Sequence, residues 1–589
     1  MVQNKQKVTI GQYYELLRRY LLPQKRALIG LALLLFTSIG LQLINPQIIR
    51  FFIDTAQSQG ELKPLFYAAG IFIGFSIVHQ VVSVLATYIS ENVAWKTTNT
   101  LRGDLAEHCL SLDMSFHKSH TSGAIIERVD GDVNALSNFF SSMIIHLVGN
   151  ILLMAGIIIL LFRENWLIGI GMTVFVVFAV YIIQWIRKFA VPVWAKWRQM
   201  NAEFYGFIGE QLEGTEDIRA NGAEGFVMNR FYALVNRMLP VRMKAFLGFA
   251  MMWNTTIIVF AIGNALAFAV SAYLWKSQAI TLGTVYLIFY YTELLAKPIE
   301  KIRTQMEDLQ RADASISRIR ELFATPSLIQ DGAGAALPEG PLGVEFRDVT
   351  FSYDRDVDDT PTLDRLQIAL QPGEVLGLLG RTGSGKSTLA RLLLRFYDPQ
   401  QGVIAIGGVD IRQCKLNALR KRVALVTQTI EIMEGTVRDN LTFYDESILD
   451  DKILEVLADL GLQEWYEALP GGLDTKLASG GGGLSAGEAQ LLAFARVFLT
   501  NPGLIIMDEA SSRLDPLTEQ RIENAIGKLL ANRSCIIIAH RLTTVQRADH
   551  ILILENGSVI ESGRRSELAA DPGSRFSRML STGLEEVLV

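Results

Sequence analysis

The sequence predicts a multidomain chain, in which an all-α, six-helix membrane domain precedes an α/β domain. Three observations predict this: apolar stretches confined to the first half, a Pro/Gly/Ala-rich segment near the middle, and alternating strand-like and helix-like runs beyond it. The chain has 589 residues, which exceeds one ordinary domain. Half of the residues are apolar and only a fifth are charged, a composition that indicates membrane spans.

The apolar stretches lie between Ala27 and Ile302, and each is near the ~20 residues that cross a bilayer. We place them at 27–50, 66–90, 138–162, 165–186, 246–273 and 281–302. Basic residues gather before the first stretch and in the two long connections, 91–137 and 187–245. By the positive-inside rule, both termini and both long connections face the cytoplasm. We expect the membrane helices to continue into the cytosol there.

Charge, cysteine content and the N-terminal residues exclude several classes of protein. The formal net charge of −5 gives no basic surface for nucleic acid, so no nucleic-acid partner is expected. The three cysteines, Cys109, Cys414 and Cys535, are too few and too far apart for a disulfide framework or a metal cluster. The start of the chain is polar and basic, and it does not have the pattern of a signal peptide.

A Gly-rich segment, Gly380-Arg-Thr-Gly-Ser-Gly-Lys-Ser387, follows a strand-like run and opens a helix. This is the pattern of a phosphate-binding loop in the context that the pattern requires. Glycines let backbone N–H groups curl around phosphate oxygens. Lys386 would place a charge on the β and γ phosphates, and Ser387 a hydroxyl on Mg²⁺. The predicted nucleotide contacts here are Gly380, Thr382, Gly383, Ser384, Gly385, Lys386, Ser387 and Thr388.

Two carboxylates, Asp508 and Glu509, end the later strand-like run Leu504-Ile-Ile-Met. Alone, such a pair could simply cap a strand. Together with a phosphate loop it indicates ATP hydrolysis, with Asp508 holding Mg²⁺ through water and Glu509 polarising the attacking water. The predicted fold is therefore an all-α six-helix transmembrane domain followed by an α/β P-loop nucleotide-binding domain. The expected ranges are 1–26 for a cytoplasmic N-terminal segment, 27–323 for the transmembrane domain, 324–343 for a linker and 344–589 for the nucleotide-binding domain.

Between these motifs, Ser479-Gly-Gly-Gly-Gly-Leu-Ser-Ala-Gly-Glu488 precedes a helical run and resembles the LSGGQ signature of ATP-binding cassette transporters. The resemblance covers nearly the whole chain. It implies that Tyr353 stacks on adenine, that Gln428 contacts the γ-phosphate and Mg²⁺, and that His540 is the switch histidine. Ser485 and Gly487 would lie nearest the γ-phosphate of a facing site. Glu509, His540 and Gln428 are the implied catalytic residues, and ATP and Mg²⁺ the implied ligands.

The membrane half resembles the exporter-type branch of that family. Leu112–Leu136 looks like its first cytoplasmic loop and Tyr205–Glu224 like its second, and short helices at the tips of such loops dock onto the ATPase domains. The family sandwiches each ATP between the phosphate loop of one ATPase domain and the signature of another, so the resemblance implies a second half-transporter as partner. The implied function is ATP-driven transport of an unidentified, amphipathic substrate across the lipid bilayer, in a bacterial inner membrane with the ATPase domain in the cytoplasm.

Two other functions stay open at this point. One is import through the same architecture, which differs only in direction. The other is a regulatory membrane protein that binds ATP without pumping; intact Glu509 and His540 argue against it, because a pure binder needs no catalytic base.

The signature departs from the family pattern, because it reads LSAGE. Ala486 adds a Cβ, which would be costly if the position needs a positive φ. Glu488 places a negative charge near an anion. Since the other catalytic residues are intact, these departures favour, slightly, a heterodimer over a homodimer.

Two ionisable residues at bilayer depth, Glu293 and His79, have two interpretations each. Glu293 precedes Lys297 by one helical turn, so an ion pair is the simpler one. The alternative is that Glu293 or His79 lines the substrate path.

Overall fold

The computed structural model describes residues 18–58, 61–142, 147–353, 361–427, 430–508, 516–539 and 545–582. The chain divides into two compact units, which are treated separately below. The first comprises Met1–Leu110 and Ser122–Thr325, and the second comprises Ser111–Thr121 and Pro326–Val589.

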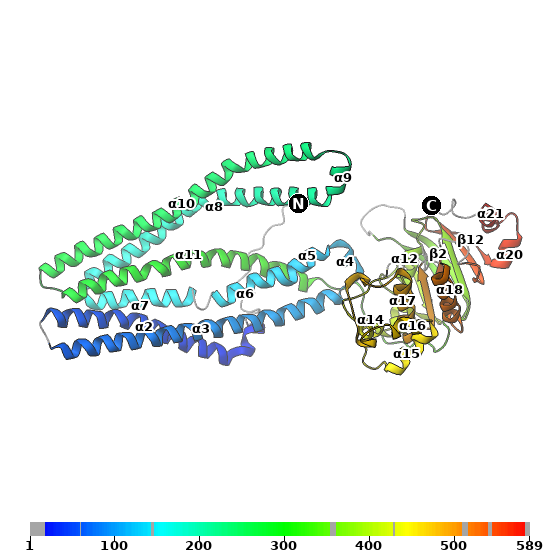
Figure 1. Cartoon of the computed structure of the whole chain (residues 1–589), viewed down its shortest axis with the longest axis horizontal. Coiled ribbons are helices and arrows are strands. Elements are labelled where there is room, and N and C mark those ends of the chain that lie inside the picture. Colours follow the sequence, from blue (N-terminus) through cyan, green and yellow to red (C-terminus); the bar gives the residue numbers. More distant parts are fainter. Residues whose placement is uncertain are drawn as a thin grey trace. The chain divides into compact units, whose positions relative to one another are not determined.

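The first unit is helical (Figure 1). Its long helices are α2 (Lys25–Gln57), α3 (Leu62–Ser111), α8 (Trp166–Glu213), α10 (Glu224–Lys276) and α11 (Leu282–Ala324), with α7 (Gly149–Glu164) shorter. The remaining helical segments are η1 (Leu22–Gln24), α5 (Ser122–Ile126), the π-helical η2 (Glu127–Gly131), α6 (Asp132–Ser142) and α9 (Thr215–Ala220). Helices α3, α8 and α10 have 50, 48 and 53 residues, so they extend well beyond the ~20 residues of a span, as expected.

Four helices of the described chain are long and apolar enough to cross a membrane, by length and composition: Arg18–Gln57, Leu62–Ser111, Trp166–Glu213 and Glu224–Lys276. The other two expected spans, 138–162 and 281–302, fall on α6 with α7 and on α11. Helix α7 has only 16 residues, and residues 143–146 before it are outside the described part. The first part of α11 carries Glu293 and Lys297, which lower its hydropathy.

Buried polar contacts join the helices of the first unit at two levels. Tyr291 on α11 is fully buried, and its hydroxyl donates to the Leu43 carbonyl on α2 at 2.8 Å. Farther along α11, Arg318 and Ser315 both donate to the carboxylate of Asp132 on α6, from Arg318 Nε at 2.8 Å and from Ser315 Oγ at 2.9 Å. Asp132 is only 2% exposed whereas the Arg318 side chain is 46% exposed, so the carboxylate is buried and its guanidinium partner reaches solvent.

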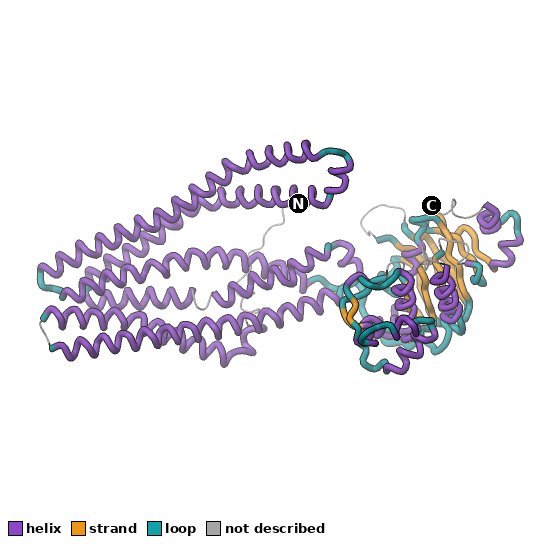
Figure 2. The backbone as a smooth tube through the Cα atoms, in the orientation of Figure 1, coloured by secondary structure: helices purple, strands orange, loops and turns teal. Residues whose placement is uncertain are grey.

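The second unit contains three sheets (Figure 2). The largest has the order β12-β11-β3-β10-β9-β6, and its strands are β3 (Val375–Gly380), β6 (Val423–Val426), β9 (Leu504–Asp508), β10 (Ser534–Ile538), β11 (His550–Glu555) and β12 (Ser558–Arg564). All neighbours pair parallel except β11 and β12. An antiparallel sheet, β2-β1-β4-β5, contains β1 (Val344–Phe351), β2 (Leu363–Leu370), β4 (Gln401–Ile406) and β5 (Val409–Asp410). The third pairs β7 (Gly435–Thr436) with β8 (Lys476–Leu477). The largely parallel central sheet confirms the predicted α/β class.

Helices surround these sheets and include α4, which the contacts place in this unit. They are α4 (Met114–Ser119), α12 (Lys386–Leu393), η4 (Ile411–Gln413), α13 (Leu416–Arg422), α14 (Val437–Thr442), α15 (Asp450–Asp459), α16 (Gln463–Glu467), η5 (Gly472–Asp474), η6 (Ser479–Gly481), α17 (Ala486–Thr500), α18 (Pro516–Leu530), α20 (Arg565–Ala570) and α21 (Arg575–Thr582).

Two hydrophobic clusters form the core of the second unit. One contains Phe494 of α17 and Phe576 of α21, and the other contains Leu389 of α12 and Phe346 of β1. Strands β3 and β10 are buried along their whole length, as expected for parallel strands covered on both faces. Their carboxyl ends meet at one edge of the sheet, where ligands bind in open α/β folds. Cys109, Cys414 and Cys535 are all buried.

Candidate active site

The phosphate loop leaves β3 at this edge and requires glycine at two positions. Gly380 has φ of 151°, and a Cβ there would collide with the carbonyl oxygen of Leu554. Gly385, with φ of 104°, is the left-handed residue that precedes α12. Both conformations are accessible to glycine and costly for other residues. The loop therefore turns sharply enough for the N-terminus of α12 to follow directly.

Lys386 is the first residue of α12 and is 5% exposed. Its ammonium donates to the carbonyls of Gly380 at 2.6 Å and Arg381 at 3.0 Å, so it lies across its own loop. Beside it, the hydroxyl oxygen of Ser384 is buried and has no hydrogen-bond partner in the described chain. A buried hydroxyl without a partner is costly unless a ligand satisfies it. A phosphate oxygen would do so, and this loop therefore fits the phosphates of a nucleotide.

Ser387 lies at the start of α12, next to Asp508 at the end of β9. The Ser387 hydroxyl donates to the Asp508 carboxylate at 3.4 Å. Hydroxyl and carboxylate oxygens together with phosphate oxygens are the ligands that Mg²⁺ takes in nucleotide sites. Among the described residues no group of three His, Cys, Asp or Glu side chains could hold a metal. The pair therefore fits an ion that is completed by the nucleotide.

The three predicted catalytic residues, Gln428, Glu509 and His540, lie outside the described residues. The strands that lead to them are described. β6, β9 and β10 are adjacent in the central sheet and end at Val426, Asp508 and Ile538. All three positions thus follow parallel strands that end at one edge, while their side-chain positions stay a prediction.

Tyr353 lies between two aromatic rings and the phosphate-loop helix. Its ring contacts Phe351 and Tyr397 edge-on, with centroids 5.0 and 5.1 Å apart. Its hydroxyl is 3.1 Å from Thr388 Oγ1 and accepts from Arg391 Nη1 at 3.0 Å. The structure thus joins two residues that the sequence predicted separately, Tyr353 and Thr388. It adds Arg391, which no sequence motif marks beyond its position one turn after Thr388.

A second residue that the sequence missed lies over the Tyr353 ring. The ammonium of Lys118, on α4, is 4.1 Å from the ring centroid, which is a cation–π distance. Asp113 caps the start of α4 by accepting from Ser115 N at 2.9 Å, and its other carboxylate oxygen accepts from Leu328 N at 2.6 Å. Helix α4, which follows α3 in the chain, therefore contacts the aromatic residue expected to hold adenine.

The altered signature folds without strain. Ser485 is the N-cap of α17, and Ala486, its first residue, does not have a positive φ. The expected cost of Ala486 is therefore absent. Glu488 accepts from Ser485 N at 2.7 Å, and Ser485 Oγ accepts from Glu488 N at 3.2 Å, which is a capping box. Gly487 is buried behind them. The charge of Glu488 stays at the helix N-terminus.

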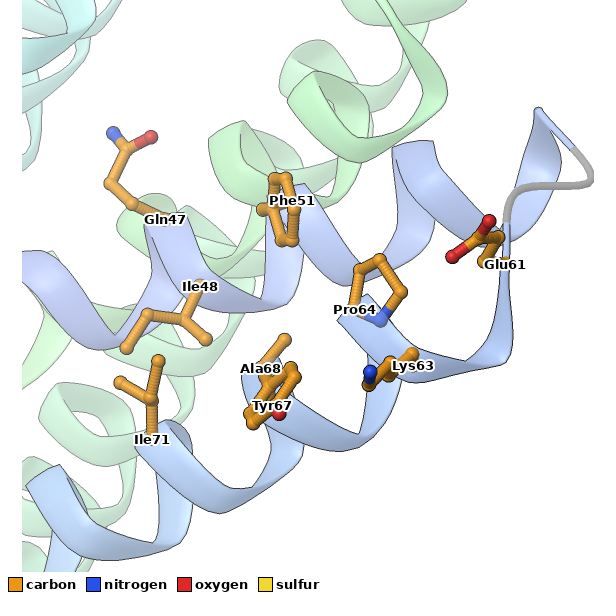
Figure 3. Close-up of a pocket in the computed structure, with 9 residues that line it drawn as sticks. All are labelled: Gln47, Ile48, Phe51, Glu61, Lys63, Pro64, Tyr67, Ala68 and Ile71. Atoms are coloured by element: carbon orange, nitrogen blue, oxygen red, sulfur yellow. The ribbon is translucent and has the colours of Figure 1, made fainter.

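Another cavity, of about 480 Å³, lies between α2 and α3 in the first unit. Figure 3 shows Ile48, Phe51, Tyr67 and Ile71 around this gap, with Gln47 pointing away from it. The Gln47 amide donates instead to the Tyr291 hydroxyl at 3.3 Å. The charged residues Glu61 and Lys63 lie at one end of the cavity, and the rest of its lining is mostly apolar.

Comparison with known proteins identifies the family. The model of the ABC transporter transmembrane region matches residues 28–299, and the ABC transporter model matches residues 363–512. The chain belongs to the ABC transporter family: it is an integral membrane protein that binds ATP, and an ATP-hydrolysing translocase.

Similar proteins match along nearly the whole chain. The ATP-dependent lipid A-core flippase of Idiomarina loihiensis is 28% identical, with 95% of each chain covered. The ABC transporter ATP-binding protein YknV of Bacillus subtilis is 29% identical, over 94% of this chain and 92% of that one. Among solved structures, a bacterial Atm1-family ABC exporter with ATP bound superposes with a TM-score of 0.78 at 23% identity, covering 95% of this chain and 98% of that chain. This last likeness shows the fold.

Proposed function

We propose that the chain is one half of a dimeric exporter or flippase, which uses ATP to move an amphipathic substrate away from the cytoplasmic side of a bacterial inner membrane. The observation that carries the proposal is the fit of the phosphate loop, with the unpartnered Ser384 hydroxyl and the Ser387–Asp508 pair, in a chain with membrane helices. The flippase relative adds support for a lipid-like substrate.

The described residues bind and orient the nucleotide. Lys386 exchanges its two carbonyl partners for phosphate oxygens, which carry more charge and form stronger hydrogen bonds. The N-terminus of α12 adds the backbone donors and positive end of a helix. Ser387 and Asp508 hold Mg²⁺, which neutralises phosphate charge when bound. Tyr353 and Thr388 place the adenine end, since both belong to one hydrogen-bonded group.

Hydrolysis is assigned to the residues that follow the three parallel strands. Glu509 polarises the attacking water, His540 contacts the γ-phosphate, and Gln428 contacts both the phosphate and Mg²⁺. The support is their place in the sequence directly after β9, β10 and β6, whose ends lie beside the phosphate loop.

A second half-transporter completes the site. Each ATP is bound between the phosphate loop of one chain and the signature of another. A single chain has only one phosphate loop and one signature, so a second chain is needed. The partner is a different chain rather than a copy, because the negative charge of Glu488 disfavours ATP at the site that this signature completes. Ala486 begins α17 without a positive φ, so this argument rests on the charge of Glu488.

Coupling to the membrane helices runs through α4 and α9. Helix α4 follows α3 directly in the chain and contacts Tyr353 through Lys118. Nucleotide at Tyr353 therefore alters the environment of a helix that continues a membrane span. Helix α9, at the tip of the second loop, docks onto the ATPase domain of the partner.

Mg-ATPase activity tests the proposal, measured in lipid nanodiscs for the chain alone and for the assembly purified through a tag on this chain. We expect the assembly to hydrolyse ATP and Glu509→Gln to lose this activity while still binding ATP. Activity of the chain alone would refute the heterodimer. ATP binding without hydrolysis in the intact assembly would favour a regulatory protein, and inward movement of substrate would favour an importer.

A further inference from the structure

A polar cavity lies within the membrane domain, between α8, α10 and α11. Its volume is about 390 Å³. Aromatic side chains from α10 line one part of it, and carboxylates from α11 line another: Phe249, Trp253, Phe260, Glu293 and Glu300. The two carboxylates among aromatic groups distinguish it from the mostly apolar cavity between α2 and α3.

Glu293 is held toward α10 and not paired with a cation. Its carboxylate accepts a hydrogen bond from the amide of Asn264. Its neighbour Lys297 forms no ion pair with it among the described residues and does not line the cavity. The simpler expectation, a Glu293–Lys297 pair, is therefore wrong, and the Glu293 carboxylate lies at the cavity with an amide rather than a cation as its partner. His79 lies elsewhere, on α3, and its Nε2 is buried without a partner in the described residues.

Glu293 lies at a membrane depth where an ionised carboxylate is unfavourable in free energy. It lies about 17 Å along α11 from the first residue, Leu282, at the rise of about 1.5 Å per residue. That places it near the middle of a hydrocarbon layer of about 30 Å. An intramembrane carboxylate faces a cavity or a partner and marks a substrate or ion path. Glu300 lies about two turns farther on, toward the cytoplasmic end.

The lining groups define what the cavity can bind. A cation would pair with the Glu293 carboxylate and lie near the aromatic side chains of Trp253 and Phe260, which line the same cavity and can attract a cation. The Asn264 Oδ1 atom is buried and has no partner in the described residues, so it can accept from a donor on the same ligand. The remaining lining residues include Ile183, Met252 and Ile257, which suit an apolar body. An anion would be repelled by the carboxylates of Glu293 and Glu300 where these are ionised.

We propose that this cavity binds an amphipathic organic cation as the transported substrate, with Glu293 as the counter-ion and the α10 aromatic residues around its apolar part. That the bound cation is also transported rests on the proposed function, whereas its binding to the cavity does not depend on ATP. Entry from the cytoplasmic end past Glu300 would bring the charged group to Glu293.

A pair of probes of equal shape and opposite charge tests the proposal. Tetraphenylphosphonium and tetraphenylborate are dialysed to equilibrium against nucleotide-free assembly in nanodiscs, with empty nanodiscs subtracted. We expect saturable binding of the cation and none of the anion. Glu293→Gln keeps the size and the Asn264 contact and should weaken cation binding about tenfold, the factor that corresponds to about 1.4 kcal/mol. Trp253→Leu should weaken it by about threefold through the lost cation–π contact.

Glu321→Gln is the matched control, because it removes an exposed carboxylate from the same helix outside the cavity and should leave binding unchanged. Thermal unfolding of each variant checks that it is folded. Equal binding of both probes, no saturable cation binding, or an unaltered Glu293→Gln would overturn the proposal. ATP hydrolysis without cation binding would refute this inference alone, and cation binding without hydrolysis would refute the proposed function alone.

Discussion

Replacing Glu488 by Gln should strengthen the binding of ATP at the site that this signature completes. Glutamine has nearly the same shape and can close the same capping box, so the substitution removes the charge and keeps the Ser485 contacts. The perturbation is therefore almost purely electrostatic.

The capping box sets the distance at which this charge acts. The Glu488 carboxylate is 2.7 Å from Ser485 N, on the residue whose hydroxyl meets the γ-phosphate in the proposed dimer. A phosphate at hydrogen-bond distance from that hydroxyl would lie ~6 Å from the carboxylate. At that separation two unit charges repel by about 0.7 kcal/mol at the dielectric constant of water and about 3 kcal/mol at an effective value of about 20. An intermediate repulsion of about 1.4 kcal/mol corresponds to a tenfold change in ATP affinity.

The assay is the KM for ATP of the purified assembly in nanodiscs, together with equilibrium binding of a fluorescent ATP analogue. We expect Glu488→Gln to lower both constants about tenfold, less at high salt because the charge is partly exposed. Its melting temperature should fall slightly, since a carboxylate at a helix N-terminus stabilises it by about 0.3–1 kcal/mol. Glu567→Gln is the matched control, removing a charge from the first turn of α20. Unchanged constants in Glu488→Gln would refute the electrostatic reasoning and, with it, the main argument for a heterodimer.

Three further results are expected. Asp132→Asn should lower the free energy of unfolding by about 2 kcal/mol in chemical denaturation, because it weakens the hydrogen bonds that join buried Asp132 to the half-exposed Arg318 and to Ser315. A loss below about 0.5 kcal/mol would contradict this contribution. Lys118→Met should leave basal ATPase activity within about twofold. It should reduce the stimulation of this activity by amphiphiles, because the cation–π contact with Tyr353 is lost. Undiminished stimulation would argue against coupling through α4. The Arg575 guanidinium, through its hydrogen bonds, holds the pKa of Glu555 below its usual value, so their pairing stabilises the fold above that value and is lost as the pH falls through the lowered pKa. Arg575→Met should therefore reduce the loss of thermal stability on acidification below about pH 4.5, and an identical pH profile would contradict this.

The sequence allowed the fold and half of the site to be predicted because those features are local. Strand β3, the glycines and Lys386 are consecutive, and the motif fixes their geometry. The capping box was also within reach of prediction, since Ser485 and Glu488 have its three-residue spacing. The condition for strain at Ala486, a positive φ, is not met because that residue begins a helix.

The contacts that the sequence could not predict join distant segments. Lys118 meets Tyr353 across more than two hundred residues, and no local pattern specifies that pairing. The same holds for Glu293, which has a basic residue one turn away but bonds to Asn264 on another helix. Helical spacing makes Lys297 available, whereas tertiary packing decides which partner is used.

ATP-driven movement of a cation in inside-out vesicles is the most direct test of the central claim, that this chain couples hydrolysis to transport. Vesicles holding the wild-type assembly or its Glu509→Gln variant receive tetraphenylphosphonium and Mg-ATP, and the cation retained inside is measured over time. The account predicts accumulation that requires ATP in the wild type and is absent in Glu509→Gln. Hydrolysis without accumulation in the wild type, or equal accumulation in both, would contradict it.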